Sequence, residues 1–123
     1  MKKKILIVDD ERDIVVILKL ALGKEGYEVI EAFDGLEALE KAAEVKPDLI
    51  LLDIMMPKMD GLSVNLKLKE DTATAKIPVI VITGRGQFKE LIDARKDIEI
   101  YAYLEKPFTV AMLMGKIKEA LGD

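Results

Sequence analysis

The stretch Leu49-Ile50-Leu51-Leu52-Asp53 places a carboxylate directly after four large apolar residues. A short, continuous apolar run of this kind is typical of a strand that is buried on both faces of a parallel sheet. Three other apolar runs also end at or near a reactive residue: Ile5–Val8 before Asp9 and Asp10, Val79–Ile82 before Thr83, and Tyr101–Leu104 before Lys106. Because the carboxyl ends of parallel strands share one edge of a sheet, we expect these residues to meet in one acidic pocket.

Longer segments with helical periodicity separate these runs, and one further strand is expected over residues 27–32. In the first segment, a buried helix face is predicted from five residues at helical spacing: Ile14, Ile17, Leu18, Ala21 and Leu22. We expect Gly26 to end this helix. Asp34, with Glu37 three residues later, is expected to cap the next helix, which Pro47 ends.

The residues after Asp60-Gly61 alternate between apolar and polar from Leu62 to Leu68, as they would in a strand. An antiparallel strand here would interrupt the alternation of strands and helices, so we interpret the segment as a helix that ends near Asp71. Asn65 interrupts its apolar face and is expected to be exposed. The last helix is predicted from an apolar stripe before Gly122, formed by Val110, Leu113, Met114, Ile117 and Leu121.

These elements predict a single-domain α/β fold, a doubly wound (βα)5 sandwich with five strands and five helices. Right-handed crossovers between strands buried on both faces require helices on both sides of one parallel sheet. A flavodoxin-like strand order of 2-1-3-4-5 places the first and third strands side by side, so that Asp9, Asp10 and Asp53 meet. The loop after the first strand contains no glycine, which argues against a dinucleotide fingerprint or a P-loop.

The composition narrows the class of protein. With 123 residues, 50% of them hydrophobic, we expect one domain over residues 1–123 and no output domain after the last helix. A net charge of −4 argues against nucleic-acid binding through bulk charge. The absence of cysteine and histidine excludes disulfides and the usual zinc ligands. The run Lys2-Lys3-Lys4 precedes too few apolar residues for a signal peptide or a membrane span, so a soluble, cytoplasmic protein is expected.

The carboxylates at the strand ends suggest a metal site, because three such groups repel one another unless a cation lies among them. The hard oxygen donors favour Mg²⁺ as the cofactor, with Mn²⁺ or Ca²⁺ as substitutes. Asp53 is the candidate nucleophile toward phosphorus, while Lys106 supplies a cation and Thr83 a hydroxyl for the phosphoryl oxygens. A cis bond at Lys106-Pro107 is expected to direct the lysine inward. Taken singly, each residue also has a structural explanation, as a helix cap, a solvated lysine or a strand former.

Together, these motifs resemble the CheY-like receiver domain of two-component response regulators over essentially the whole chain. The resemblance rests on the order and spacing of Asp9-Asp10, Asp53 with Met56-Pro57, Asp60-Gly61, Thr83, Tyr103 and Lys106-Pro107-Phe108. It implies that a histidine kinase or a histidine phosphotransfer protein phosphorylates Asp53 in a reaction that requires Mg²⁺.

The resemblance also implies a role for each site residue. Asp10, Asp53 and the main-chain carbonyl of Met55 would bind Mg²⁺, with Asp9 contributing through water. Thr83 and Lys106 would hold the phosphoryl oxygens. The protein would not be an enzyme, and at most it would catalyse its own phosphorylation and dephosphorylation. Tyr103 would rotate inward as Thr83 moves, although simple packing also explains a tyrosine at this place.

The family further implies two protein contacts. The fourth helix, fifth strand and fifth helix would bind a downstream protein, and Phe88, Leu91 and Ile92 lie at helical spacing in the fourth helix. The domain would be a monomer or a phosphorylation-dependent dimer. Kinase specificity is expected on the first helix, at Arg12, Ile14, Val15 and Leu18, with core packing as the competing explanation.

Two other functions remain open on the sequence. A pseudo-receiver would act only as a binding scaffold, but the complete set of site residues argues against it. A phosphohydrolase with an aspartyl-phosphate intermediate is the second alternative. Enzymes of the haloacid dehalogenase type carry a second aspartate two residues after the nucleophile, where this chain has Met55.

Overall fold

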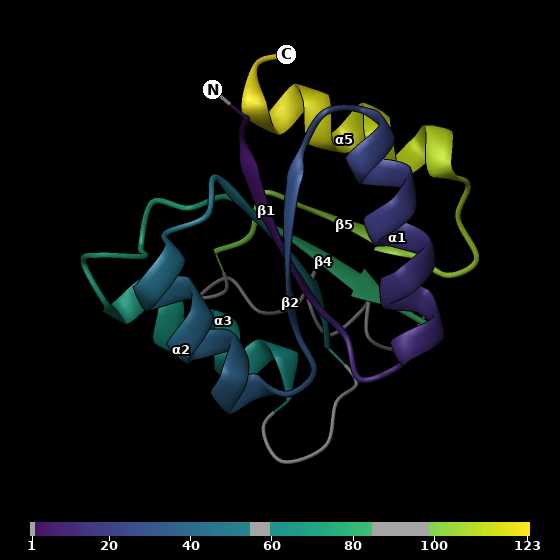
Figure 1. Cartoon of the computed structure of the whole chain (residues 1–123). Helices are drawn as coiled ribbons and strands as arrows, with labels where there is room; N and C mark the ends of the chain where they lie inside the picture. The colour runs from purple at the N-terminus through teal and green to yellow at the C-terminus, as the bar shows by residue number, and fades with distance from the viewer. Residues whose placement is uncertain (1, 55–59, 85–98) are drawn as a thin grey trace.

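The chain forms a five-stranded parallel sheet with helices on both faces (Figure 1). A computed structural model describes residues 2–54, 60–84 and 99–123. In chain order the elements are β1 (Lys4–Val8), α1 (Arg12–Lys24), β2 (Glu28–Ala32), α2 (Gly35–Val45), β3 (Leu49–Asp53), α3 (Gly61–Glu70), β4 (Val79–Thr83), β5 (Ala102–Glu105) and α5 (Val110–Leu121). The strand order is β2-β1-β3-β4-β5, which confirms the predicted order and fold class. The helix predicted between β4 and β5, with Phe88, Leu91 and Ile92, lies outside the described residues, as do Met55, Met56 and Pro57.

Successive strand residues point to opposite faces of the sheet and build two hydrophobic cores. One core lies under α1 and α5 and takes Ile5, Ile7, Leu49, Leu51, Ile80, Ile82 and Leu104 from the strands. The other lies under α2 and α3 and takes Leu6, Val8, Ile50, Leu52, Val79 and Val81. The continuous apolar runs in the sequence therefore reflect strands that are covered on both sides.

The buried face of α1 differs from the prediction. Val15, Leu18 and Leu22 are buried, whereas Ile17 is 58% exposed, so the prediction that Ile17 lies in the core is wrong. Residues 14–18 are all apolar, and this run allows two rotations of the helix that differ by about one residue, or roughly 100°. Gly26 adopts φ +91° just beyond Glu25, the C-cap of the helix, and the backbone amide of Tyr27 donates to the carbonyl of Leu22. The predicted helix end at Gly26 is therefore confirmed.

The caps of α2 and α3 follow the sequence. Asp34 accepts a hydrogen bond from the backbone amide of Glu37 at 2.9 Å, and Asp60 caps α3 through the amide of Ser63. The interpretation of the segment after Asp60-Gly61 as a helix is thus confirmed, since α3 spans Gly61–Glu70. Asn65 was expected to be exposed, which is wrong: it is 2% exposed, and its side-chain amide donates to the carbonyl of Glu99 at 2.9 Å.

The last helix, α5, packs through Leu113, Met114 and Ile117, and it ends at Gly122, which adopts φ +73°. Val110, predicted on the buried stripe, is 46% exposed because it occupies the first helical position, at the edge of the sheet. Among the helices that the structure describes, none combines the length and the apolar character needed to cross a lipid bilayer.

Candidate functional site

The strand register brings the predicted site residues to one edge of the sheet. Val8 pairs with Leu52 and Asp53 pairs with Ile82, so Asp9 follows β1 beside Asp53. Thr83 pairs with Glu105 in β5, and the backbone amide of Lys106 donates to the carbonyl of Thr83 at 2.7 Å. Residues at or just after the ends of four neighbouring strands therefore form one row along the carboxyl ends of β1, β3, β4 and β5.

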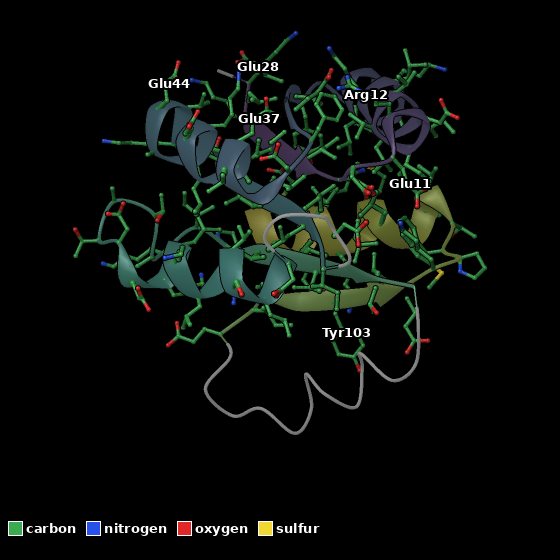
Figure 2. All side chains as sticks on the ribbon, turned by 90° about the horizontal axis from the view of Figure 1, so that it is seen from below. Glu11, Arg12, Glu28, Glu37, Glu44 and Tyr103 are labelled. Atoms are coloured by element: carbon green, nitrogen blue, oxygen red, sulfur yellow. The ribbon has the colours of Figure 1, made fainter. Side chains whose placement is uncertain are left out.

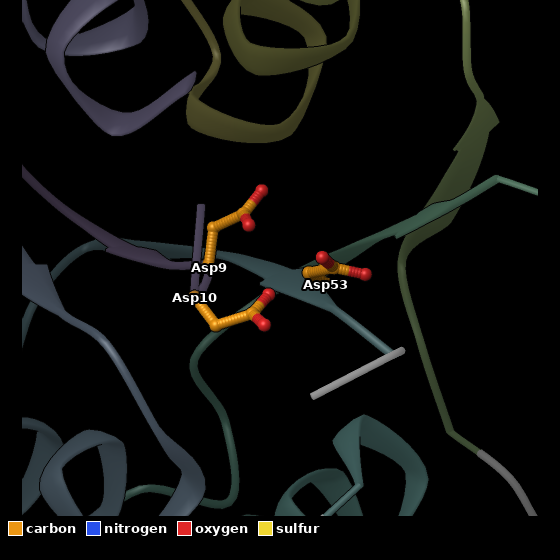
Figure 3. Close-up of side chains that lie close together, drawn as sticks. All are labelled: Asp9, Asp10 and Asp53. Carbon is orange, nitrogen blue, oxygen red and sulfur yellow. The ribbon is translucent and has the colours of Figure 1, made fainter. Parts of the chain in front are cut away.

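The acidic part of this row has the donor set of a metal site. Asp9, Asp10 and Asp53 each offer a carboxylate oxygen, and these oxygens all lie within 4.8 Å of one another. Figure 3 shows Asp9 and Asp10 extending from the end of β1 toward Asp53. Asp9 and Asp53 are 1% and 3% exposed, whereas Asp10 is exposed and open to solvent. A buried pair of carboxylates with a third at the surface is able to hold a hard cation that keeps part of its water shell.

One oxygen of Asp9 supports the same interpretation. Its Oδ1 accepts a hydrogen bond from the backbone amide of Glu11 at 2.9 Å. Its Oδ2 is buried and has no hydrogen-bond partner within the described part of the chain. Buried polar atoms are almost always satisfied, and a carboxylate oxygen is a preferred ligand for Mg²⁺. The residues present therefore fit a divalent cation.

Lys106 is the cation of the site. Its Nζ lies 3.6 Å from Oδ2 of Asp9 and 3.7 Å from Oδ2 of Asp53. Burial opposes the charge on Lys106, but the nearby carboxylates of Asp53 and Asp9 outweigh this effect and raise its pKa. The lysine is therefore charged at neutral pH and faces the two buried carboxylates. The Lys106-Pro107 peptide bond is cis.

Thr83 and Tyr103 lie on neighbouring strands, β4 and β5. Thr83 is fully buried at the end of β4. Tyr103 pairs with Val81 and is partly buried against the core beneath α2 and α3, at the lower edge of the view in Figure 2. The two residues predicted to act as a switch thus belong to adjacent strands near the acidic row.

Gly61 is a structural requirement of the site that the sequence analysis did not identify. A Cβ atom at this position would lie 2.4 Å from Cα of Ile54 and 2.6 Å from the carbonyl oxygen of Asp53. The start of α3 therefore packs directly on the backbone that carries Asp53. The sequence offered a signal in the Asp60-Gly61 pair, but not the close approach that explains the glycine.

Comparison with known proteins agrees with this arrangement. The family model for the response regulator receiver domain matches residues 5–118. The chain belongs to the response regulator receiver family. The receiver domain is similar to the alkaline phosphatase synthesis transcriptional regulatory protein PhoP of Bacillus subtilis, with 42% identity over 98% of this chain and 49% of that protein. It is also 35% identical to sporulation initiation phosphotransferase F of the same species, over 98% of this chain and 95% of that protein.

Solved structures share the fold. Chemotaxis protein CheY4 of Vibrio cholerae has a TM-score of 0.89 and 29% identity, over 98% of this chain and all of that chain. The receiver domain of sensor histidine kinase PA1611 from Pseudomonas aeruginosa, described with magnesium coordinated in its active site cleft, has a TM-score of 0.88 and 26% identity, with both chains fully covered.

This receiver domain spans about half the length of the first curated relatives that it matches, 49% for PhoP and 48% for the Synechocystis regulator RpaA. The family makes it a two-component signalling domain rather than an enzyme.

Proposed function

We propose that this receiver domain is a phosphorylation switch whose acceptor is Asp53, served by a histidine kinase or a histidine phosphotransfer protein. One observation carries the proposal: Asp53 is buried within reach of two further carboxylates and of Nζ of Lys106, 3.7 Å away. A carboxylate between an acidic cluster and a lysine is suited to accept a phosphoryl group, because the negative charge on the phosphoryl oxygens meets a cation already in place.

In the transfer, a carboxylate oxygen of Asp53 forms a new bond to phosphorus while the phosphorus–nitrogen bond of a phosphohistidine breaks. The bonding electron pair stays on the imidazole nitrogen, and the ring leaves neutral because its other nitrogen keeps a proton. With a small acyl phosphate the phosphorus–oxygen bond breaks instead, and the carboxylate leaves as an anion. Attack of water on the phosphorylated side chain of Asp53 then restores the carboxylate and releases inorganic phosphate.

Asp9, Asp10 and Asp53 would hold Mg²⁺, together with the main-chain carbonyl of Met55, which lies outside the described residues. When bound, the ion supplies positive charge next to the phosphoryl oxygens. The ammonium group of Lys106 pairs with one phosphoryl oxygen, and the Thr83 hydroxyl donates a hydrogen bond to another phosphoryl oxygen. The buried position of Asp53 keeps bulk water away from the product.

Phosphorylation of Asp53 adds about one negative charge at the edge of the sheet. We infer that Thr83 follows this charge and that Tyr103, on the adjacent strand, fills the space it leaves. The surface formed by β5, α5 and the segment before β5 would then change, and a downstream protein would bind it.

The kinase is proposed to contact the exposed face of α1. Val15 and Leu18, two of the residues expected to set specificity, are only 1% and 4% exposed, so core packing explains them. Three other residues of this helix present apolar surface to solvent instead: Val16, Ile17 and Leu20, at 56%, 58% and 63% exposure. An exposed apolar strip on the helix that starts at the acidic pocket fits a partner helix that brings its phosphohistidine to Asp53.

Incubation with acetyl phosphate and Mg²⁺, followed by intact-mass measurement, tests the proposal. We expect a gain of one phosphoryl group that is lost in Asp53→Asn and retained in Glu44→Gln, a control at an exposed carboxylate on α2 (Figure 2). A wild-type protein that gains no phosphoryl group would show it to be a scaffold. Continuous turnover of an added phosphate ester would show a phosphohydrolase instead.

A further inference from the structure

Arg12 is an exposed cation at the rim of the acidic pocket, at the first position of α1 (Figure 2). Its guanidinium carbon lies 4.1 Å from the centroid of the Phe33 ring. At this distance the guanidinium makes a cation–π contact with the ring.

Phe33 is itself held in place. Its backbone amide donates to Oε1 of Glu37 at 2.7 Å, and its ring packs against the core beneath α1 and α5. Glu37 in turn is fixed at the start of α2, where its amide donates to Asp34. The ring under Arg12 is therefore a rigid platform rather than a mobile surface side chain.

The platform lies directly beside the acidic cluster. Phe33 follows Ala32, whose carbonyl accepts a hydrogen bond from the backbone amide of Asp9 at 3.2 Å. Neighbouring strands are about 4.8 Å apart, so the backbone at Phe33, after β2, lies two strand positions or roughly 10 Å from the end of β3, whereas Lys106 follows β5 on the other side of β3. Lys106 reaches both buried carboxylates, at 3.6 Å and 3.7 Å, and Arg12 is a second cation on the β2 side of the acidic row.

Apart from its contact with Phe33, Arg12 has no evident stabilising interaction within the described part of the chain. A cation at a helix N-terminus opposes the helix dipole, so the first turn of α1 is an unfavourable place for it. Within the described part of the chain, Arg12 makes no hydrogen bond and no ion pair, and its five N–H donors remain available. The acidic row meanwhile repels any anionic phosphodonor that approaches it.

We propose that Arg12 is a specificity-determining residue that binds anionic oxygens of the incoming phosphodonor, with Phe33 as its positioning residue. The chemical class is a phosphoryl donor that carries negative charge near the bond to be broken. This inference rests on the function proposed above, because it concerns the donor for Asp53. It assigns to Arg12 the recognition of the donor and leaves transfer to the buried residues.

The test compares the rate of phosphorylation of Arg12→Gln and wild type with two small donors at saturating Mg²⁺ and low salt. For acetyl phosphate, a dianion, we expect kcat/KM to fall about fourfold, through a raised KM with unchanged kcat. For phosphoramidate, which carries less negative charge, the loss is expected to be about twofold. Both losses should fade in high salt, because the contact is solvent-exposed.

Two further variants separate this contact from general charge and from folding. Lys19→Gln removes a cation from the same helix, where Lys19 pairs with Glu31 at 2.7 Å, and should leave both rates unchanged. Phe33→Leu keeps the core apolar but removes the platform, and should raise KM by about half as much as the loss of Arg12. If Arg12→Gln and Lys19→Gln have the same kcat/KM for both donors while wild type is phosphorylated normally, the inference about Arg12 is overturned and the proposed function stands. If wild type does not react, the proposed function fails with it.

Discussion

Replacing Gly61 by alanine tests whether the start of α3 fixes the acceptor. The added Cβ would lie 2.4 Å from Cα of Ile54, whereas ordinary contacts are 3.4–4 Å, so the two backbones must separate by about 1 Å. Both atoms that it meets at closest range belong to the backbone, which cannot rotate away as a side chain can. The backbone amide of Gly61 also donates to the carbonyl of Ile54 at 3.1 Å, and the separation would weaken this bond.

Overpacking of this kind costs about 1–3 kcal/mol, so we expect Gly61→Ala to lose about 2 kcal/mol of unfolding free energy. For a domain of this size the loss corresponds to a decrease in Tm of about 5–10 °C. Because Asp53 is attached to the displaced backbone, its phosphorylation by acetyl phosphate should slow about tenfold or more, even under conditions where the variant is fully folded.

Urea denaturation and the rate of mass gain measure the two effects. Gly115→Ala in α5 is the matched control, because a Cβ there meets nothing within 4 Å. It should stabilise the domain by about 0.5–1 kcal/mol through helix propensity and leave the rate unchanged. Equal stabilities and equal rates for Gly61→Ala and wild type would refute the reasoning that α3 positions the acceptor.

Three further predictions concern other parts of the molecule. Lys106→Met leaves Asp9 and Asp53 without their cation and should destabilise the metal-free domain by about 1–3 kcal/mol, with a smaller loss in excess Mg²⁺, as measured by urea denaturation; equal losses would contradict it. Burial and the bond to Asp123 raise the pKa of Tyr27 to about 12, so stability should fall as pH rises from 10 to 12, and Tyr27→Phe should flatten this slope; an unchanged slope would count against the contact. Asn65→Asp should destabilise by about 2–3 kcal/mol at pH 7 and by less at pH 4, where a neutral carboxyl is able to donate to the carbonyl of Glu99; a pH-independent loss would exclude this bond as the cause.

The sheet and its reactive edge were predictable from sequence because buried parallel strands leave a strong local signal. Four apolar runs, each followed by a polar residue, fixed both the strand positions and the set of residues that meet at their ends. Handedness and the need to cover both faces predicted the doubly wound sandwich, and the flavodoxin-like fold supplied the strand order. Asp9, Asp10, Asp53 and Lys106 meet as expected because register, rather than loop conformation, places them.

The helix faces were less predictable, because their assignment depends on what each helix meets. In α1 every residue from Ile14 to Leu18 is apolar, so periodicity alone could not decide whether Val15 or Ile17 faces the sheet. In α3 the buried Asn65 breaks the apolar pattern, and its reason lies in the distant carbonyl of Glu99. No local pattern encodes such a partner.

Three features of this domain are unfavourable for stability, and they lie on α1 or in the acidic pocket at which α1 starts. Leu20 exposes apolar surface on α1, Arg12 opposes the dipole of the same helix, and Asp9 and Asp53 are buried side by side. Each feature is unfavourable for an isolated domain, since each would be removed by a sequence optimised for stability alone. They become favourable together only if an apolar partner covers α1, an anionic donor meets Arg12, and a cation joins the carboxylates. In the proposed function, one encounter with a phosphodonor protein and a metal ion would satisfy all three.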